Sequence, residues 1–209
     1  MTTRMPNRKD TYWAQAREEG FAARSVFKLR EVDDQHHILA PGAHVLDLGC
    51  APGSWLQLIA DRVGRKGMVV GVDLSPMGIT LPPHVTTFQM DVTKVDKSTL
   101  PEGLLPLDAL VSDLAPHTTG IRSTDQARSF DLTALALRLA DQWLRPGGSF
   151  LAKTFQGGDT PRLLQAVRLR YDKSASIRPK ATRKPSFEVY VLGKGFKGVP
   201  PVDKDPLQG

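Results

Sequence analysis

Cysteine and long apolar runs are the scarcest features of this sequence. Cys50 is the single cysteine in 209 residues, which excludes an internal disulfide and any metal site built from several cysteines. No apolar run approaches the roughly 20 residues of a membrane-spanning helix, and no early segment is typical of a signal peptide. We therefore expect a cytoplasmic protein that does not contact membranes. Cys50 follows a glycine in a tight turn, which favours a small core residue over a reactive thiol.

The amount of charge is ordinary, but its sign is not balanced. Charged residues are 24% and hydrophobic residues 40% of the chain, as in a folded protein of one domain. The net charge of +6 favours a polyanionic partner. Basic residues gather near both ends of the chain: Arg4, Arg8, Lys9, Arg17, Arg24, Lys28 and Arg30, and then Arg178, Lys180, Arg183 and Lys184. If the two clusters converge on one face, they would bind phosphates with an affinity that falls as salt rises.

Strand-like apolar runs alternate with helix-like segments. We expect strands at 45–48, 68–73, 85–91, 107–113 and 149–156, weaker strands at 175–177 and 187–192, and helices at 10–19, 24–34, 56–63, 125–144 and 161–171. This order predicts an α/β fold with a doubly wound, mostly parallel sheet that binds ligands above the carboxyl ends of its strands. We divide the chain into a basic, partly flexible segment (residues 1–23), a single domain (24–193) and a flexible tail (194–209).

The stretch HVLDLGCAPGSW, His44–Trp55, joins the first expected strand to a helix through a glycine-rich loop. A dinucleotide site has the spacing G-x-G-x-x-G, whose glycines admit two phosphates at the helix N-terminus. Here Pro52 removes one amide donor and Trp55 adds bulk, so the loop suits a nucleoside without phosphates better. A nicotinamide or nucleotide-sugar enzyme with an atypical loop is the alternative at this point.

Acidic residues end three of the expected strands. Asp73, Asp91 and Asp113 each stand at a carboxyl end, so a parallel sheet would place them around one crevice. Asp73 could bind ribose hydroxyls, and Asp91 could accept a hydrogen bond from the amino group of an adenine. One such acid means little because Asp often starts turns, but three above a glycine loop indicate a ligand site.

Two further charges lie inside apolar strands. Lys153 stands in LAKTFQ, and a buried ammonium needs a partner, for which Asp113 is the nearest candidate. A purely structural ion pair is the alternative. Glu188 stands in FEVYVL, where an outward-facing acid on a half-buried strand is the simpler interpretation. Lys28, on the helix expected at 24–34, would by itself be read as a solvated charge.

These four residues carry a close resemblance to a known family. Lys28 in RSVFKL, Asp113 in SDLAP, Lys153 in AKTFQG and Glu188 in FEVYV resemble the Lys-Asp-Lys-Glu tetrad of ribose 2′-O-methyltransferases. The wider sequence, from about Arg24 to Val191, resembles the FtsJ/RrmJ family of ribosomal RNA methyltransferases. The resemblance implies a seven-stranded Rossmann-like sheet over the domain at 24–193. It also implies S-adenosyl-L-methionine as cofactor, contacted by residues at five matching positions: Gly53, Trp55, Asp73, Asp91 and Asp113.

The resemblance also implies a role for each member of the tetrad. Lys153 would be the general base that takes the proton of the ribose hydroxyl, which requires its pKa to fall from about 10.4 toward neutrality. Burial and a second cation lower a lysine pKa, so we expect Lys28 to destabilise charged Lys153 and to orient the ribose. Asp113 would hold Lys153, and Glu188 would complete the network. No metal is expected, because the sulfonium group already activates the methyl group.

The same resemblance names the partner. It implies methylation of a ribose, a uridine ribose, in the RNA of the large ribosomal subunit by a monomeric enzyme. The alternatives are the same reaction on a transfer RNA or another RNA, and an RNA-binding protein without catalysis. The intact tetrad argues against the last of these, because binding alone does not explain a lysine at position 153. His117 stands where the family has an asparagine after SDxAP, and its role stays open. Trp55 has packing as its alternative role.

Overall fold

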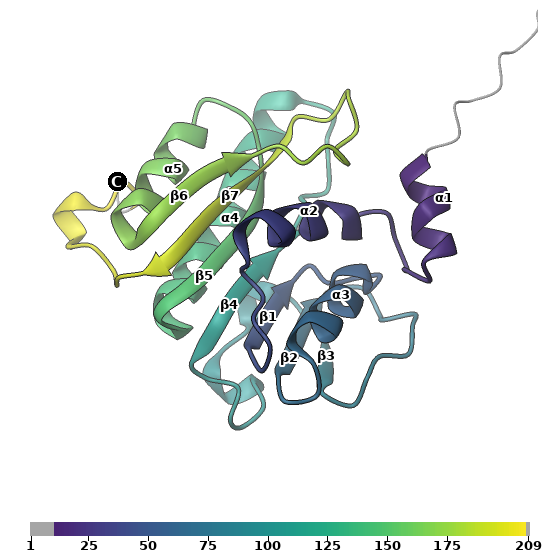
Figure 1. Ribbon diagram of the computed structural model, residues 1–209. Coiled ribbons are helices and arrows are strands. Elements are labelled where there is room, and N and C mark those ends of the chain that lie inside the picture. Colours follow the sequence, from purple (N-terminus) through teal and green to yellow (C-terminus); the bar gives the residue numbers. More distant parts are fainter. Residues whose placement is uncertain (1–10, 208–209) are drawn as a thin grey trace, which may run out of the picture.

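The computed structural model describes residues 11–207, which form one seven-stranded sheet with helices on both faces (Figure 1). The strands lie in the order β3-β2-β1-β4-β5-β7-β6. Their bounds are β1 His44–Leu48, β2 Met68–Asp73, β3 Val85–Gln89, β4 Leu107–Ser112, β5 Leu144–Phe155, β6 Tyr171–Ile177 and β7 Glu188–Phe196. The helices are α1 Thr11–Glu18, α2 Val26–His36, α3 Ser54–Val63, α4 Arg122–Trp143 and α5 Thr160–Arg170, with short 3-10 turns at Val92–Lys94, Lys97–Thr99 and Val202–Lys204. The predicted α/β fold is confirmed.

The sheet is parallel from β3 to β5 and antiparallel beyond. β1 pairs in parallel with both β2 and β4, while β7 runs antiparallel between β5 and β6. The chain starts at β1, goes outward to β3 and returns to β4, so the direction of the strand order changes between β1 and β4. An α/β sheet binds its ligands at such a switch point, and the glycine loop that follows β1 lies there.

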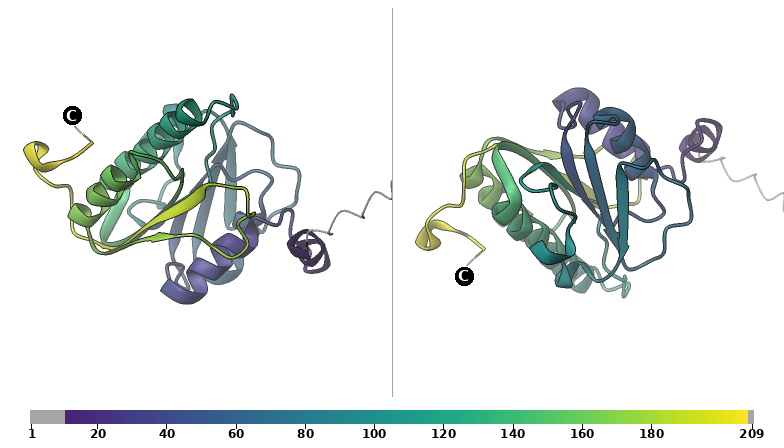
Figure 2. Two further views of the ribbon diagram at one scale, coloured as in Figure 1. Left: turned by 90° about the horizontal axis from the view of Figure 1, so that it is seen from above. Right: turned by 90° about the horizontal axis from the view of Figure 1, so that it is seen from below.

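Two layers of helices cover the two faces of the sheet (Figure 2). Because side chains alternate along a strand, Val45 and Leu151 pack toward α2 and α3, while Leu46 and Phe150 pack toward α4 and α5. This alternation also decides on which face each polar strand residue lies. None of the helices within residues 11–207 has the length and apolarity that crossing a bilayer requires.

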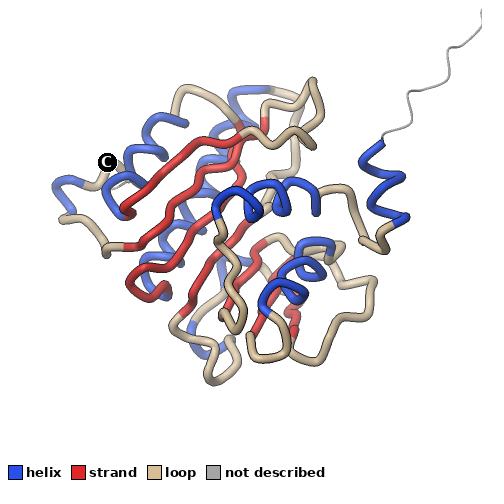
Figure 3. Tube along the Cα trace, in the orientation of Figure 1, coloured by secondary structure: helices blue, strands red, loops and turns tan. Residues whose placement is uncertain are grey.

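Helix α1 lies beside the main body, next to α2 (Figure 3). Ala16 is its buried residue, and the link from α1 to α2 is held by α3. The Gln57 side chain accepts a hydrogen bond from the Ala22 amide (2.8 Å) and donates one to the Gly20 carbonyl (3.0 Å). The start of α2 is therefore fixed against the helix that follows the glycine loop.

The C-terminal part differs from the sequence-based boundaries. The strand predicted to end at 192 continues as β7 through Phe196, which is buried, and Lys194 donates to the carbonyl of His36 at the end of α2 (2.6 Å). Asp205, in the tail predicted to be flexible, is buried and pairs with Arg170 of α5 at 2.5 Å. The tail residues are held by partners distant in sequence, which local composition does not reveal. The predicted strand at 175–177 likewise begins earlier, at Tyr171.

Candidate active site

Lys153 and Asp113 meet at the carboxyl ends of two neighbouring parallel strands. Lys153, on β5, is 6% exposed, and its Nζ lies 3.1 Å from Oδ1 of Asp113, which directly follows β4. The same Nζ donates to the main-chain carbonyl of Asp113 at 2.7 Å. The predicted pairing is therefore confirmed. The ammonium group, costly to bury alone, has two acceptors on one residue.

Lys28 and Glu188 form a second pair beside the first. Lys28 is on α2, and its Nζ lies 2.7 Å from Oε2 of Glu188 at the start of β7. Val26 and Leu29 of α2 are fully buried, so the helix presses closely on the sheet and Lys28 is largely covered. The solvated-charge interpretation of Lys28 and the outward-facing interpretation of Glu188 are both wrong.

Tyr190, which the sequence analysis did not single out, connects the two pairs. Its hydroxyl donates to Oδ1 of Asp113 at 2.6 Å, and Nζ of Lys28 lies 5.9 Å from the centre of its ring. Tyr190 lies opposite Lys153 in the β5–β7 ladder and two residues from Glu188, so all three side chains share the face that α2 covers. The spacing E-x-Y in FEVYVL was the available signal. Burial, with the charge of Asp113 adding to it, raises the pKa of Tyr190 well above its usual range, which keeps the hydroxyl a donor.

The glycine loop after β1 is enclosed by two other loops. Gly49 has φ +79°, and a Cβ there would lie 2.9 Å from the backbone nitrogen of Leu114, next to Asp113. Gly53 has φ +109°, and a Cβ there would lie 2.5 Å from Ile79 in the segment after β2. Both positions require glycine because of their left-handed backbone and these close approaches.

The other two strand-end acids lie at the carboxyl ends of β2 and β3. The Asp73 carboxylate accepts hydrogen bonds from the amides of Ala51 (2.9 Å) and Ser75 (2.8 Å), so it braces the glycine loop. A carboxylate has about four acceptor sites, so Asp73 keeps capacity for ribose hydroxyls. Asp91 accepts a hydrogen bond from the Thr93 amide at 2.9 Å. Hydrogen bonds from the Thr93 amide and side chain lower the pKa of the Asp91 carboxyl. Asp91 therefore stays an ionised acceptor at the end of β3.

Asp47, in the middle of β1, is a buried carboxyl that the sequence analysis overlooked. It is 0% exposed, and neither oxygen has a hydrogen-bond partner within residues 11–207. Burial, followed by the charges of Asp113 and Asp73, raises its pKa well above the usual range. Buried polar groups without partners are rare in native proteins and call for a bound molecule or another explanation.

This set of acceptors fits S-adenosylmethionine. Besides one carboxylate, the cofactor carries an ammonium group, a sulfonium cation, two ribose hydroxyls and an adenine amino group, and these four favour acidic or acceptor neighbours. Asp47, Asp73 and Asp113 supply such neighbours beside the glycine loop, Asp91 supplies another after β3, and clustered carboxylates would repel the phosphates of a dinucleotide. Among the described residues, no group of three or more His, Cys, Asp or Glu side chains is placed to hold a metal ion.

Trp55 and Cys50 belong to the hydrophobic core next to the glycine loop. The Trp55 side chain is 2% exposed, its indole N–H donates to the Ser25 carbonyl (2.9 Å), and its ring lies 5.8 Å from that of Tyr190. The indole therefore packs against Tyr190, as in the packing alternative for Trp55. Cys50 is buried, and burial raises the pKa of its thiol, which confirms it as a small core residue.

His117 lies on the exposed loop after β4. Its carbonyl accepts a hydrogen bond from Arg128 (3.3 Å). The same loop is tied to α4 by Asp125, which accepts from the amides of Thr119 (2.7 Å) and Gly120 (3.2 Å). The loop that carries His117 is thus anchored close to Asp113.

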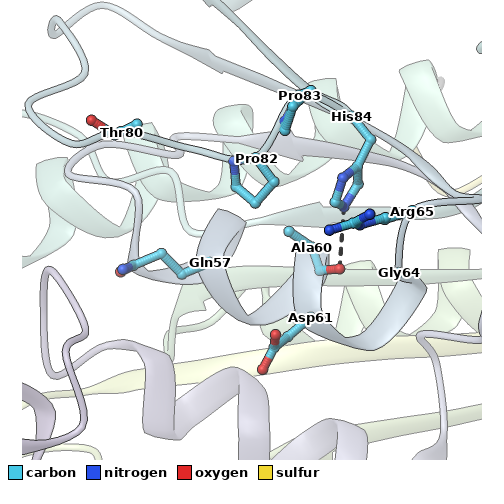
Figure 4. A pocket seen from close by; sticks show the side chains of 9 residues that line it. All are labelled: Gln57, Ala60, Asp61, Gly64, Arg65, Thr80, Pro82, Pro83 and His84. Atoms are coloured by element: carbon cyan, nitrogen blue, oxygen red, sulfur yellow. Dashed lines mark hydrogen bonds between the residues drawn. The ribbon is translucent and has the colours of Figure 1, made fainter.

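A cavity lies away from these residues, between α3 and the segment before β3 (Figure 4). It measures about 760 Å³ and is lined by Gln57, Ala60, Asp61, Gly64, Arg65, Thr80, Pro82, Pro83 and His84. His84 contacts the Ala60 carbonyl through Nε2 at 3.3 Å. The lining has one acid, the exposed Asp61, so the cavity matches the cofactor less well than the acidic residues around the glycine loop do.

Three residues of the two basic clusters converge. Arg24 and Lys28 from the N-terminal cluster and Arg183 from the C-terminal cluster line one small cavity. Arg24 also donates to the Ala181 carbonyl (2.5 Å). Arg4, Arg8 and Lys9 lie outside the described residues.

Comparison with known proteins agrees with this geometry. The FtsJ-like methyltransferase family model matches residues 21–196. The curated Ribosomal RNA large subunit methyltransferase E of Desulfosudis oleivorans is 44% identical over 184 residues, which cover 88% of this chain and 89% of the relative. Its namesake from Nitratidesulfovibrio vulgaris strain DP4 is 41% identical over 203 residues, covering 96% and 100%.

A solved structure extends the likeness to three dimensions. It comes from a Plasmodium falciparum protein assigned as a ribosomal RNA methyltransferase. It matches with a TM-score of 0.74 at 26% identity, over 85% of this chain and all of the other. From the match across the domain and from these identities, the chain belongs to the FtsJ-like methyltransferase family, whose members use S-adenosylmethionine.

Proposed function

We propose that the protein transfers a methyl group from S-adenosylmethionine to the ribose 2′-hydroxyl of a uridine in large-subunit ribosomal RNA. The names of the curated relatives support the substrate, and the basic surface suits an RNA. The observation that carries the assignment is the double contact of Lys153 Nζ with the carboxylate and carbonyl of Asp113. We further propose that the enzyme acts in the cytoplasm, since ribosomal RNA is the partner. We also propose that it acts as a monomer.

Lys153 is the general base of this proposal. When bound, S-adenosylmethionine supplies a methyl group already activated by its sulfonium centre. As a neutral amine, Lys153 donates its two hydrogens to the two Asp113 oxygens, which leaves its lone pair for the ribose hydroxyl proton. Held in this way, the amine has one orientation, and alignment of this kind contributes much of the rate.

The remaining residues position the ribose and the base. Lys28, paired with Glu188, donates to ribose oxygens and places a positive charge beside Lys153. Tyr190 fixes Asp113 through the 2.6 Å hydrogen bond. Asp73 and Asp91 bind the cofactor ribose and adenine, with Gly53 and the Trp55 backbone forming the floor of the site.

The test is methyl transfer with wild type, Lys153→Met and the matched control Lys173→Met. Lys173 is an exposed lysine on β6, so its variant makes the same change away from the site. Labelled cofactor is incubated with large subunits, naked ribosomal RNA or transfer RNA, and the label is mapped. We expect label on a ribose 2′-oxygen of large-subunit RNA. Lys153→Met should lower kcat about 10²–10⁴-fold with cofactor affinity retained.

Two outcomes would contradict the proposal. Label found in transfer RNA alone would contradict ribosomal RNA as the substrate. Equal turnover of Lys153→Met and Lys173→Met would contradict Lys153 as the general base.

A further inference from the structure

A small basic cavity lies directly beside the Lys28–Glu188 pair. It measures about 210 Å³, with Arg24 and Lys28 on the α2 side and Arg183 on the side of the loop before β7. This volume is below the roughly 300–1,000 Å³ of pockets that hold a whole drug-sized ligand. The cavity is therefore the size for a small group such as a phosphate.

The loop that forms one wall is held in shape by Arg178. Its guanidinium donates to the carbonyls of Ser186 (2.5 Å), Arg183 (3.3 Å) and Lys184 (3.3 Å). Arg178 is thus occupied inside the loop, although the sequence placed it with the other basic residues as a phosphate ligand. The wall that carries the Arg183 side chain is preorganised, which lowers the entropic cost of binding.

The opposite wall is fixed as well. Arg24 donates to the Ala181 carbonyl, and its guanidinium lies 5.4 Å from the centre of the Tyr12 ring. Ser25, the next residue, is the N-cap of α2, whose N-terminal end carries the positive part of the helix dipole. Both walls therefore present positive charge to the same small space, which Glu188, paired with Lys28, also lines.

The charges of this cavity favour an anion. Burial lowers the pKa of the Arg24 guanidinium, the nearby charge of Arg183 lowers it further, and Glu188 opposes the effect. An anion bound between the two arginines would reduce their repulsion and receive charge-assisted hydrogen bonds, for which guanidinium groups are well shaped.

We propose that this cavity binds the backbone phosphate that flanks the methylated ribose, with Arg24 and Arg183 as its ligands. This inference rests on the proposed function, because it uses Lys28 as the neighbour of the target ribose. The cavity fixes the register of the RNA strand: with the phosphate held there, the adjoining sugar reaches Lys28 and Lys153. Such a contact carries no base information, so it selects the backbone geometry around the target.

The test compares Arg183→Gln with the matched control Arg168→Gln. Both remove one charge from an exposed arginine, but Arg168 is on α5, which covers the other face of the sheet. Measured quantities are kcat and KM for large-subunit RNA, RNA affinity by filter binding at several salt concentrations, and cofactor affinity by calorimetry. Arg183→Gln should raise KM and Kd for RNA about tenfold. It should leave kcat and cofactor affinity close to wild type and reduce the salt slope of binding by about 0.7–0.9.

The outcomes separate the cavity from the proposed function. Equal RNA affinity and salt slope for Arg183→Gln and Arg168→Gln would overturn the phosphate site, as would a loss confined to kcat. A wild-type protein that binds this RNA without methylating it would refute the proposed function. The cavity would still be supported in that case if Arg183→Gln weakened binding. Arg24→Gln provides a second variant and should show the same salt effect, provided its thermal unfolding midpoint is unchanged.

Discussion

Replacing Asp47 with asparagine should change how stability depends on pH. The folded-state pKa of Asp47 is raised by burial and by the charges of Asp113 and Asp73, above the value of about 3.9 in an unfolded chain. Between those two pKa values the folded state holds a proton that the unfolded state has released. The free energy of unfolding therefore falls as pH rises through this window.

The size of the effect follows from proton linkage. One group contributes at most about 1.4 kcal/mol per pH unit between its unfolded and folded pKa values. Asparagine has no such proton. As pH rises above about 4, the free energy of unfolding of Asp47→Asn should therefore increase relative to that of wild type. Beyond the folded-state pKa the difference should stop changing.

The assay is urea unfolding without cofactor at about pH 5, 6 and 7, with both proteins fitted to one slope m. Asp61→Asn, which changes an exposed carboxyl on α3, is the matched control and should run parallel to wild type. Parallel curves for Asp47→Asn and wild type would refute the reasoning. Asp47→Asn should also bind S-adenosylmethionine more weakly, because the buried carboxyl is one of the acceptors assigned to it.

Two further predictions concern Tyr190 and the C-terminal tail. Tyr190→Phe removes the hydroxyl that donates to Asp113. Because hydrogen bonds to charged groups contribute about 1.5–3 kcal/mol, kcat should fall tenfold or more with RNA KM nearly unchanged; a change confined to KM would contradict a positioning role. Asp205→Ala leaves the buried Arg170 with one carboxylate fewer, so the free energy of unfolding should fall by about 3–5 kcal/mol. Asp203→Ala, in the exposed turn nearby, should have little effect in the same urea titration, and equal losses for both variants would count against the ion pair.

Much of the fold could be predicted because local pattern determines it. The apolar runs ending in Asp73 and Asp113, with helices between them, predict parallel strands and a crevice at their carboxyl ends. The position of β7 could not be predicted in this way. Its place between β5 and β6 depends on cross-strand pairing such as Lys153 opposite Tyr190, and pairing partners are not encoded in either strand alone.

The site residues also differ in how far the sequence alone could predict them. Lys28 and Glu188 have ordinary alternative interpretations one by one, and only the resemblance to a family grouped them. Asp47 was missed because VLDL reads as one apolar strand, and its lack of a partner is visible only in three dimensions. Arg178 was assigned to the phosphate-binding surface on its charge, while in the structure its donors are used by loop carbonyls. Composition gives the charge of a residue but not how its hydrogen-bonding capacity is used.

The interior place of β7 has a consequence for how the enzyme is made. Among the seven strands of the described part this one is translated last, yet it joins β5 to β6 and brings Glu188 and Tyr190 to residues translated long before. A nascent chain that lacks it leaves β5 and β6 without their shared partner strand and has neither Glu188 nor Tyr190 beside Lys28, Asp113 and Lys153. Activity should therefore arise in a single late step of synthesis, and chains that stop before β7 should be both silent and prone to aggregate.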